Sequence, residues 1–348
     1  MLATVLGMVL IASGTYFALS RLSTKSGPAA PPTTTAPIFT PPGTIFVAQH
    51  GAIYTISKGR VGRLNLSTST FWAQPAVSPD GSQLVVSAGD SRFTDLFLVS
   101  PTGEIRRRLT NDSAREVDQN HWAFYPRFSS DGGSLYYSWD PKNPGNTFRV
   151  DLAVYSLDLK NEQAPPGRRW TEPDAFTGGD VHPQPVKGGS LLYAGYSAGS
   201  DLQIQSRIWL QSRPGVSGRP LTELIANCGS PALSPAGDQL AMICSPTAEK
   251  ANLVVAPFSN GVIGPPTLTI DDQLAASPAW SPDGTSISYL AAGKGGTGFD
   301  LWWIPTKATA TVTGSATPSP SPGVTPGRRQ VTTGLDLDAT STPAWSPL

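Results

Sequence analysis

The stretch PAWSPDGTSISY, residues 278–289, decides the fold because versions of it recur along the chain. The other copies are PAVSPDGSQLVV from Pro75, PRFSSDGGSLYY from Pro126, PQPVKGGSLLY from Pro183, PALSPAGDQLAM from Pro231 and a short PAWSPL from Pro343. Successive prolines are 47 to 65 residues apart. A repeat of this length with strand-like content is typical of a solenoid or a propeller.

Each repeat predicts a unit of four strands. In the copy quoted above, Pro278 fits the first residue of a short strand, and residues 281–284 (SPDG) form a turn. Residues 286–290 alternate polar and apolar side chains, as a half-buried strand does. Residues 300–304 and 329–332 supply a third and a fourth strand. Four strands per unit without helical periodicity are typical of a propeller blade.

The two chain ends complete the count of blades. Residues 44–47, 52–55 and 61–64 supply the second to fourth strands of a blade that lacks its first strand. The unpaired copy at 343–346 supplies it. We therefore expect an all-β protein, a six-bladed β-propeller of four-stranded antiparallel blades, closed by pairing of the N- and C-terminal strands. Closure leaves no long open edge, which an open solenoid would have.

The six copies resemble the TolB-type, WD40-like propeller repeats, in which a PxWSPDG phrase leads each blade. The resemblance covers residues 43–348. It implies interactions in the cell envelope. The chain departs from TolB in that about 42 residues precede the first blade, too few for the N-terminal α/β domain of TolB. The partners of the Tol system therefore do not carry over.

The N-terminal region predicts a membrane anchor. Residues 1–20 carry no charged side chain and are long enough to span a bilayer as a helix. A cleaved signal peptide is the alternative, although a basic n-region is missing. Arg21 and Lys25 favour a cytoplasmic location for the rest of the chain, but long domains translocate largely regardless of such charges. We expect a single-pass, membrane-anchored chain with a Pro/Thr-rich linker at 21–42 and an extracytoplasmic propeller.

Two further features bear on compartment and on blade length. Cys228 and Cys244 are symmetric about the turn at residue 236, on the strand face shared with Leu240 and Met242. A disulfide there would imply an oxidising compartment, and two buried thiols are the alternative. Residues 306–327 are rich in Thr, Ser and Pro, and their composition predicts a disordered loop in the last blade.

Composition and motifs exclude several function classes. The formal net charge is +0 and no basic footprint is present, so nucleic acid is not an expected partner. The sequence lacks H-E-x-x-H, C-x-x-C and acidic calcium-loop motifs, so we predict no metal, no cofactor and no catalytic residue. The string G-x-S-x-G at 195–199 is not a nucleophile elbow, because a strand rather than a helix follows it.

The remaining candidate is the face of the propeller at the mouth of its channel. Loops that precede the first strand of a blade, or join its second and third strands, gather there. Loops 111–125 and 139–150 carry charged and aromatic side chains, a mixture typical of recognition surfaces. A structural alternative is that His182 caps a strand while Trp122 and Phe124 seal the gap between blades two and three. The candidate ligand-binding residues are His50, Arg92, His121, Trp122, Arg149, Asp180 and His182.

From these features we predict a non-catalytic, membrane-tethered monomer that binds a protein, a peptide or an envelope component at the channel mouth. One alternative is a hydrolase or lyase with an axial metal or a His/Asp pair at the mouth. Another is a structural extracellular module without a small ligand.

Overall fold

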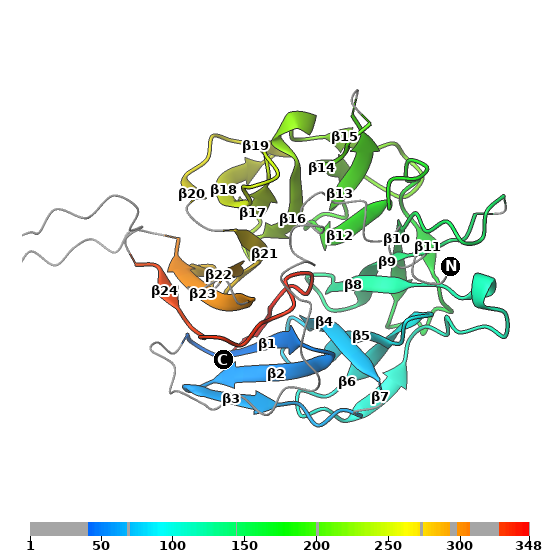
Figure 1. The fold of residues 1–348 in the computed structure, drawn as a ribbon, viewed down its shortest axis with the longest axis horizontal. Coiled ribbons are helices and arrows are strands. Elements are labelled where there is room, and N and C mark those ends of the chain that lie inside the picture. Colours follow the sequence, from blue (N-terminus) through cyan, green and yellow to red (C-terminus); the bar gives the residue numbers. More distant parts are fainter. Residues whose placement is uncertain are drawn as a thin grey trace, which may run out of the picture.

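Six antiparallel sheets follow one another round a central axis (Figure 1). The structure is a computed structural model that describes residues 41–347, except 68–69, 144, 200–201, 272–273, 293–297 and 307–326. Within each sheet the strands follow chain order from the centre outwards, except where the two chain ends share a sheet. The predicted six-bladed propeller of four-stranded blades is confirmed.

Blades 2 to 4 each hold four strands in sequence. Blade 2 has β4 (Phe71–Val77), β5 (Leu84–Gly89), β6 (Thr94–Val99) and β7 (Ile105–Arg108). Blade 3 has β8 (Ala123–Phe128), β9 (Ser134–Trp139), β10 (Ala153–Asp158) and β11 (Arg168–Arg169). Blade 4 has β12 (Asp180–Pro185), β13 (Leu191–Ala198), β14 (Ile204–Gln211) and β15 (Arg219–Pro220).

Blades 5 and 6 follow the same plan, with one addition. Blade 5 has β16 (Cys228–Leu233), β17 (Gln239–Cys244) and β18 (Asn252–Ser259), and β18 pairs with both β19 (Val262–Ile263) and β20 (Leu268–Ile270). Blade 6 has β21 (Ala275–Trp280), β22 (Ser286–Ala292), β23 (Phe299–Pro305) and β24 (Arg329–Gln330). Short 3-10 turns, η1 (Val117–Gln119) and η2 (Leu224–Ala226), precede blades 3 and 5.

Blade 1 joins the two ends of the propeller. It consists of β25 (Ala344–Ser346), β1 (Thr44–Gln49), β2 (Ala52–Ser57) and β3 (Arg60–Arg63). β25 pairs antiparallel with β1, so that Ala344 lies opposite Phe46. The Trp345 indole N–H donates a hydrogen bond to the carbonyl of Pro42 at 2.7 Å. The predicted closure is confirmed.

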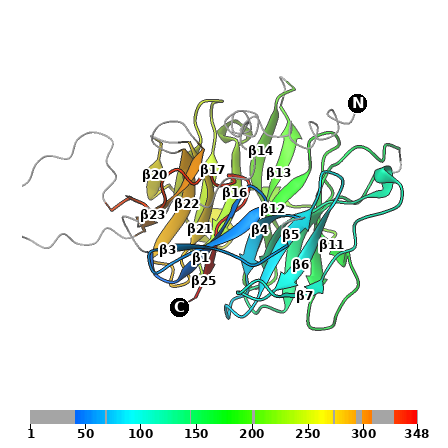
Figure 2. The same cartoon turned by 60° about the horizontal axis from the view of Figure 1, so that its bottom comes forward.

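The first strands of the blades form the inner wall of the ring. β4, β8, β12, β16, β21 and β25 contact one another in this order, and β25 contacts β4 again. Figure 1 shows β4, β8, β12, β16 and β21 nearest the centre, with short fourth strands such as β7 and β11 at the periphery, and Figure 2 shows β25 beside β1. A site on the axis is therefore built from first strands.

The first strands begin earlier than the sequence predicts. In blade 6 the strand starts at Ala275, and Pro278 lies inside it rather than at its first residue. The register between β21 and β22 shifts between Ala276 and Ala279, which marks a β-bulge. A bulge on an edge strand tolerates proline, because no ladder hydrogen bond is needed from its nitrogen.

The SPDG phrase forms the turn that links the first and second strands. In blade 6 the Gly284 N–H donates to the Ser281 carbonyl at 2.9 Å, and Gly284 has φ +69°. The Ser281 hydroxyl and the Thr285 N–H both donate to Asp283 Oδ1, at 2.6 and 3.0 Å. These side-chain and backbone bonds explain why the phrase recurs without any role in binding.

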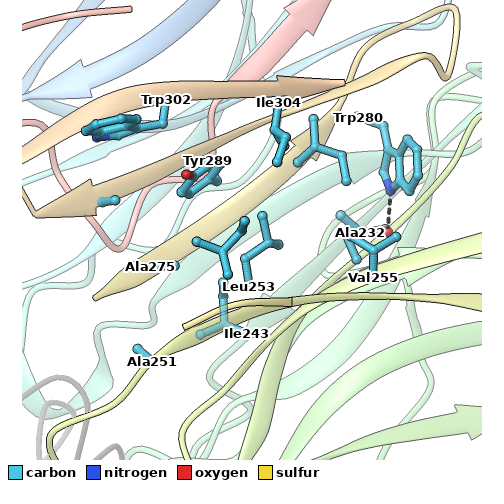
Figure 3. Close-up of a cluster of buried hydrophobic side chains, with 14 residues drawn as sticks. Ala232, Ile243, Ala251, Leu253, Val255, Ala275, Trp280, Tyr289, Trp302 and Ile304 are labelled. Carbon is cyan, nitrogen blue, oxygen red and sulfur yellow. Dashed lines mark hydrogen bonds between the residues drawn. The ribbon is translucent and has the colours of Figure 1, made fainter. Parts of the chain in front are cut away.

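Apolar side chains fill the spaces between neighbouring blades. Figure 3 shows the cluster between blades 5 and 6, where Leu253, Ile287 and Tyr289 are fully buried. The Trp280 indole N–H donates to the Ala232 carbonyl at 2.9 Å and ties the two blades together. Burial of such side chains contributes about 1.5–3 kcal/mol each, so the blades are held mainly by their shared faces.

The recurring aspartates at the start of the third strands are structural. Asp300 accepts hydrogen bonds from the Thr332 hydroxyl at 2.9 Å and from the Gly334 N–H at 3.0 Å. Asp95 likewise accepts from the Thr110 hydroxyl at 3.1 Å and from the Asp112 N–H at 2.8 Å. Each carboxylate therefore anchors the segment that leaves the fourth strand for the next blade.

The two cysteines are joined in a Cys228–Cys244 disulfide. They lie opposite each other in the register of β16 and β17 and share a face with Leu240 and Met242. Of the two alternatives that the sequence left open, the structure has the disulfide.

Three predictions concern residues outside the described part of the chain. The N-terminal anchor at 1–20 lies there entirely, as does nearly all of the linker at 21–42 and of the insert at 306–327. No helix in the described part of the chain has the length and apolar character needed to cross a membrane.

Candidate functional site

One end of the propeller gathers the loops that precede each first strand and the loops that join second and third strands. We call this end the mouth face. The strand registers place both kinds of loop together, since adjacent strands are antiparallel. Two contacts join them directly: the Asn120 amide donates to the Arg92 carbonyl at 3.3 Å, and the Asp140 N–H donates to the Trp122 carbonyl at 2.9 Å. The predicted arrangement of these loops is confirmed.

Below the mouth, the bulges of the first strands bring a ring of side chains to the channel. The residue before the proline has a left-handed backbone in five blades, with φ between 48° and 54°, and these residues are Gln74, Tyr125, His182, Ser230 and Ser277. Thr342 holds the same place in blade 1. Left-handed non-glycine residues often indicate functional strain. Here the repetition shows that they belong to the blade design.

Contacts between neighbouring blades fix the ring in place. Gln74 Oε1 accepts from the Tyr125 N–H at 2.8 Å and from the Ser87 hydroxyl at 3.1 Å. The Tyr125 and His182 rings lie 4.0 Å apart between centroids, at an interplanar angle of 38°. The Ser277 hydroxyl donates to the Ala339 carbonyl at 2.8 Å. The ring is therefore organised before any ligand enters.

A cavity of about 20 Å³ lies in the channel against this ring. Its lining consists of the residues before the prolines of blades 1 to 4, the three prolines of blades 2 to 4, and Arg127. Contributions from four blades place the cavity on the axis of the propeller. One half of the ring carries large polar and aromatic side chains, while blades 5, 6 and 1 carry Ser230, Ser277 and Thr342.

His182 is the one sequence-predicted site residue that lines this cavity. The sequence placed it in a loop, but it is the third residue of β12, because the first strand starts before its proline. Burial, and after it the charge of Arg127, lowers the pKa of His182 to about 3. At neutral pH the cavity therefore contains a neutral imidazole beside a guanidinium.

The other two histidines lie on different blades of the mouth face. His50, in the β1–β2 turn, has its Nε2 atom 3.3 Å from Asp336 Oδ2. His121 precedes β8, with Nδ1 2.7 Å from the Asp140 carbonyl oxygen and its ring stacked on Trp139 at 4.3 Å. The carbonyl assigns the proton to Nδ1, which leaves Nε2 as an acceptor in the neutral ring. The three histidines do not form a common site.

Arg92 and Arg149 are each held by a nearby aspartate. Arg92 pairs with Asp90 at 2.6 Å and stays exposed in the β5–β6 turn. Arg149 pairs with Asp151 at 2.7 Å, and its guanidinium carbon lies 4.6 Å from the centroid of the Phe176 ring. The latter contact joins the loop after β9 to the loop before β12 on the mouth face.

Trp122 stacks on Phe124 at 5.8 Å between centroids. Both side chains are half-buried and pack against the cluster that contains Val181, Leu192 and Leu240. Because this cluster consists of residues of blades 3 to 5, Trp122 and Phe124 cover the gap between blades 3 and 4. The alternative drawn from the sequence, a seal between blades two and three, is wrong.

Burial raises the pKa of four aspartates near the mouth, Asp112, Asp140, Asp180 and Asp338. Burial raises the pKa of Asp180 to about 7, partly offset by a hydrogen bond from Thr171. Asp180 is not part of the cavity lining: its Oδ1 lies over Gly195, beside the Trp209 ring. For Asp112 the pKa is about 6, because the effect of burial exceeds that of a 2.9 Å hydrogen bond from the Trp139 indole, which lowers it.

Among the described residues, no three His, Cys, Asp or Glu side chains gather in a way that would hold a metal ion.

Solved structures of other proteins share this architecture. No family model matches the chain and no curated protein matches it. A TolB from Acinetobacter baumannii is 16% identical, with a TM-score of 0.61, over 90% of this chain and 69% of that one. A putative TolB from Agrobacterium tumefaciens is also 16% identical, with a TM-score of 0.50, over 88% and 99%. This chain has the fold of a TolB-like propeller.

The same fold occurs outside that group. Kuenenia stuttgartiensis hydrazine synthase is 13% identical, with a TM-score of 0.57, over 88% of this chain and 50% of that one. At such identities the likeness concerns the fold, so the site of this TolB-like propeller must be argued from its own residues.

Apolar side chains are unevenly distributed over the surface of this TolB-like propeller. Eight large hydrophobic side chains are exposed among the described residues. Six of them lie at the mouth face, on loops or strand starts of blades 2 to 5, and these are Phe71, Val117, Phe148, Phe176, Leu202 and Ile225. The remaining two, Ile105 and Val262, lie at the opposite end. Leu202 is 82% exposed and Phe176 69%.

Sequence reasoning missed these apolar residues and also Arg127. The apolar side chains stand singly in polar loops, so no periodicity distinguishes them from core residues. Arg127 could have been found, because it replaces the alanine that follows the proline in four other copies of the repeat. Comparison of the repeats with one another contained that signal.

The raised pKa of Asp180 predicts how the stability of this TolB-like propeller depends on pH. Because its folded-state pKa is raised, its contribution to stability is complete below about pH 4 and is lost as pH rises through about 7. We expect Asp180→Asn to unfold like the wild type at pH 4 and to be more stable at pH 8, by at most about 4 kcal/mol. Urea unfolding at the two pH values measures this. Equal stability at pH 8 would show that Asp180 is ionised without penalty.

Proposed function

We propose that this chain is a non-catalytic binding propeller whose mouth face docks a protein or peptide partner. The observation that carries the proposal is the gathering of exposed apolar side chains at that face. Aromatic and apolar groups mixed with arginine are typical of the centres of protein interfaces. A preorganised channel behind them offers a place for a protruding part of the partner.

The loops that would bind are built on a rigid support. Arg149 lies over Phe176 and pairs with Asp151, while His121 stacks on Trp139, whose indole is held by Asp112. Ordered side chains lose less conformational entropy when they bind, which favours affinity. This part of the mouth face, between blades 3 and 4, is therefore our candidate for the centre of the interface.

We further propose that the propeller works outside the cytoplasm, tethered to the membrane by residues 1–20, and as a monomer. The Cys228–Cys244 disulfide supports an oxidising compartment, where such bonds persist. The uncharged stretch of residues 1–20 supports the tether. Protease accessibility of the propeller in intact spheroplasts, compared with lysed ones, tests the side of the membrane.

Substitution of the apolar mouth residues tests the docking proposal. A triple variant, Val117→Ser, Phe148→Ser and Phe176→Ser, removes three exposed side chains from blades 3 and 4. Exposed substitutions change stability by about 0.5 kcal/mol or less, so the fold is expected to remain. We expect the partner that co-purifies with the full-length wild type to be lost from the triple variant.

The matched control is Ile105→Ser with Val262→Ser, which removes exposed apolar side chains from the opposite end. This variant is expected to retain the partner. Retention by the triple variant, or loss from the control alone, would contradict docking at the mouth face. Thermal unfolding of both variants checks that neither result comes from misfolding.

A further inference from the structure

Arg127 departs from the pattern of its own repeat. The residue after the proline is alanine in blades 1, 2, 5 and 6, where Ala344, Ala76, Ala232 and Ala279 are at most 5% exposed. Blade 4 has Gln184 at this place and blade 3 has Arg127. Four blades show that a methyl group satisfies the geometry. The arginine is therefore not required by the blade design, which makes it a candidate for function.

The guanidinium of Arg127 has no charged partner in its surroundings. No hydrogen bond or ion pair joins it to any residue in the described part of the chain. Burial lowers the pKa of Arg127 to about 10, and no carboxylate offsets this. The side chain is half-buried, and it stays charged at neutral pH because its lowered pKa is still well above 7. An uncompensated cation in such a position is costly to the folded state.

The rest of the cavity also favours an anion. None of the lining residues is acidic. The His182 imidazole is neutral at neutral pH and brings no second charge. Gln74 already uses its Oε1 to accept two hydrogen bonds, so its amide group has N–H donors left to offer. The cavity thus presents one fixed positive charge and uncommitted donors.

The size of the cavity restricts the ligand group. About 20 Å³ of space is enough for one or two water-sized groups, given that one water needs about 10–15 Å³. A carboxylate has two oxygen atoms and pairs with guanidinium through two parallel hydrogen bonds. Only a small group of a larger ligand fits the enclosed space beside Arg127, and the remainder of the ligand would lie toward the mouth.

We propose that the Arg127 cavity binds a carboxylate group of the ligand that enters the channel. This inference rests on the proposed function, because it specifies what the partner inserts below the mouth face. The carboxylate is either an acidic side chain or the C-terminus of a peptide, and both present the same chemistry to Arg127. Binding relieves the unpaired charge, so the ligand would recover part of the stability that Arg127 costs the free protein.

The test uses the full-length protein and small carboxylates as probes. Acetate, N-acetylglycine and N-acetylaspartate amide are titrated at constant ionic strength, and binding is followed by saturation-transfer NMR. Acetamide serves as the neutral analogue. N-acetylglycine carries a chain-terminal carboxylate and N-acetylaspartate amide a side-chain one, so their relative affinities distinguish the two sources. We expect saturable binding of all three carboxylates and none of acetamide.

Three variants assign the binding to Arg127. Arg127→Ala restores the residue of four other blades, and Arg127→Gln copies the residue of blade 4 while keeping most of the volume. We expect each to weaken acetate binding at least tenfold, and Arg127→Ala to melt no lower than the wild type. Gln184→Ala, at the same place in the neighbouring blade, is expected to bind acetate like the wild type.

Two results would overturn the proposal: no saturable carboxylate binding by the wild type, or equal binding by the wild type and Arg127→Gln. The proposed docking at the mouth face can fail separately. In that case the triple variant of the mouth residues would keep its partner while acetate binding still depended on Arg127.

Discussion

Deletion of residues 343–348 is expected to unfold the propeller at ordinary temperatures. The deletion removes β25, the first strand of blade 1, and leaves β1 without its inner neighbour. It also removes Ala344 and Trp345, which are 4% and 8% exposed and belong to the clusters on either side of blade 1. Loss of one buried tryptophan alone costs about 3–5 kcal/mol. Together with the lost strand pairing, this approaches the whole stability of a typical domain.

A deletion of equal length in the Thr/Ser/Pro-rich insert, residues 314–319, serves as the control. The composition of that segment predicts no packed structure, so the control is expected to melt like the wild type. Circular dichroism melting of the three proteins measures the effect. A cooperative transition of the C-terminal deletion within a few degrees of the wild type would show that β25 does not close the ring.

Removal of the disulfide is expected to have the second largest destabilising effect. Cys228 and Cys244 are separated by 16 residues and join β16 to β17. A cross-link that closes a loop of this length stabilises by about 3 kcal/mol, chiefly by restricting the unfolded chain. We expect the double variant Cys228→Ala, Cys244→Ala to lose about that amount in urea unfolding under oxidising conditions.

The reductant provides the control for this prediction. Wild-type protein unfolded with dithiothreitol should approach the stability of the double variant, while the variant itself should not respond to dithiothreitol. If reduced and oxidised wild type unfold at the same urea concentration, the disulfide does not contribute to stability. A function for it would then have to be sought elsewhere.

Much of the fold could be predicted because one repeat explains all six. The copy at Pro343 and the incomplete blade at residues 44–64 were enough to predict closure, which β25 and β1 confirm. The starts of the first strands could not be predicted. Proline at 278 read as a strand boundary, whereas a bulge places it inside β21. The sequence also predicted longer fourth strands than the two residues of β11, β15 and β24. These strands are short because an outer strand pairs with a neighbour on one side only.

The candidate site was predicted less completely, for physical reasons. Turn chemistry and strand alternation indicated the position of the mouth loops, and therefore the neighbourhood of His121, Trp122 and Arg149. Whether a side chain points into the channel depends on the bulge, which separates His182 from Asp180 although they are two residues apart. The exposure of Phe148 and Phe176 depends on loop conformation, which no local pattern specifies.

The central claim is that the mouth face is the surface that meets the partner, and site-specific photo-crosslinking in living cells tests it most directly. A benzophenone amino acid is placed singly at positions 148, 176 and 202 on the mouth face, and at 105 and 262 on the opposite end. The account predicts one common crosslinked product from the first three positions and none from the last two. The same product from positions 105 and 262, without any from the mouth face, would contradict it.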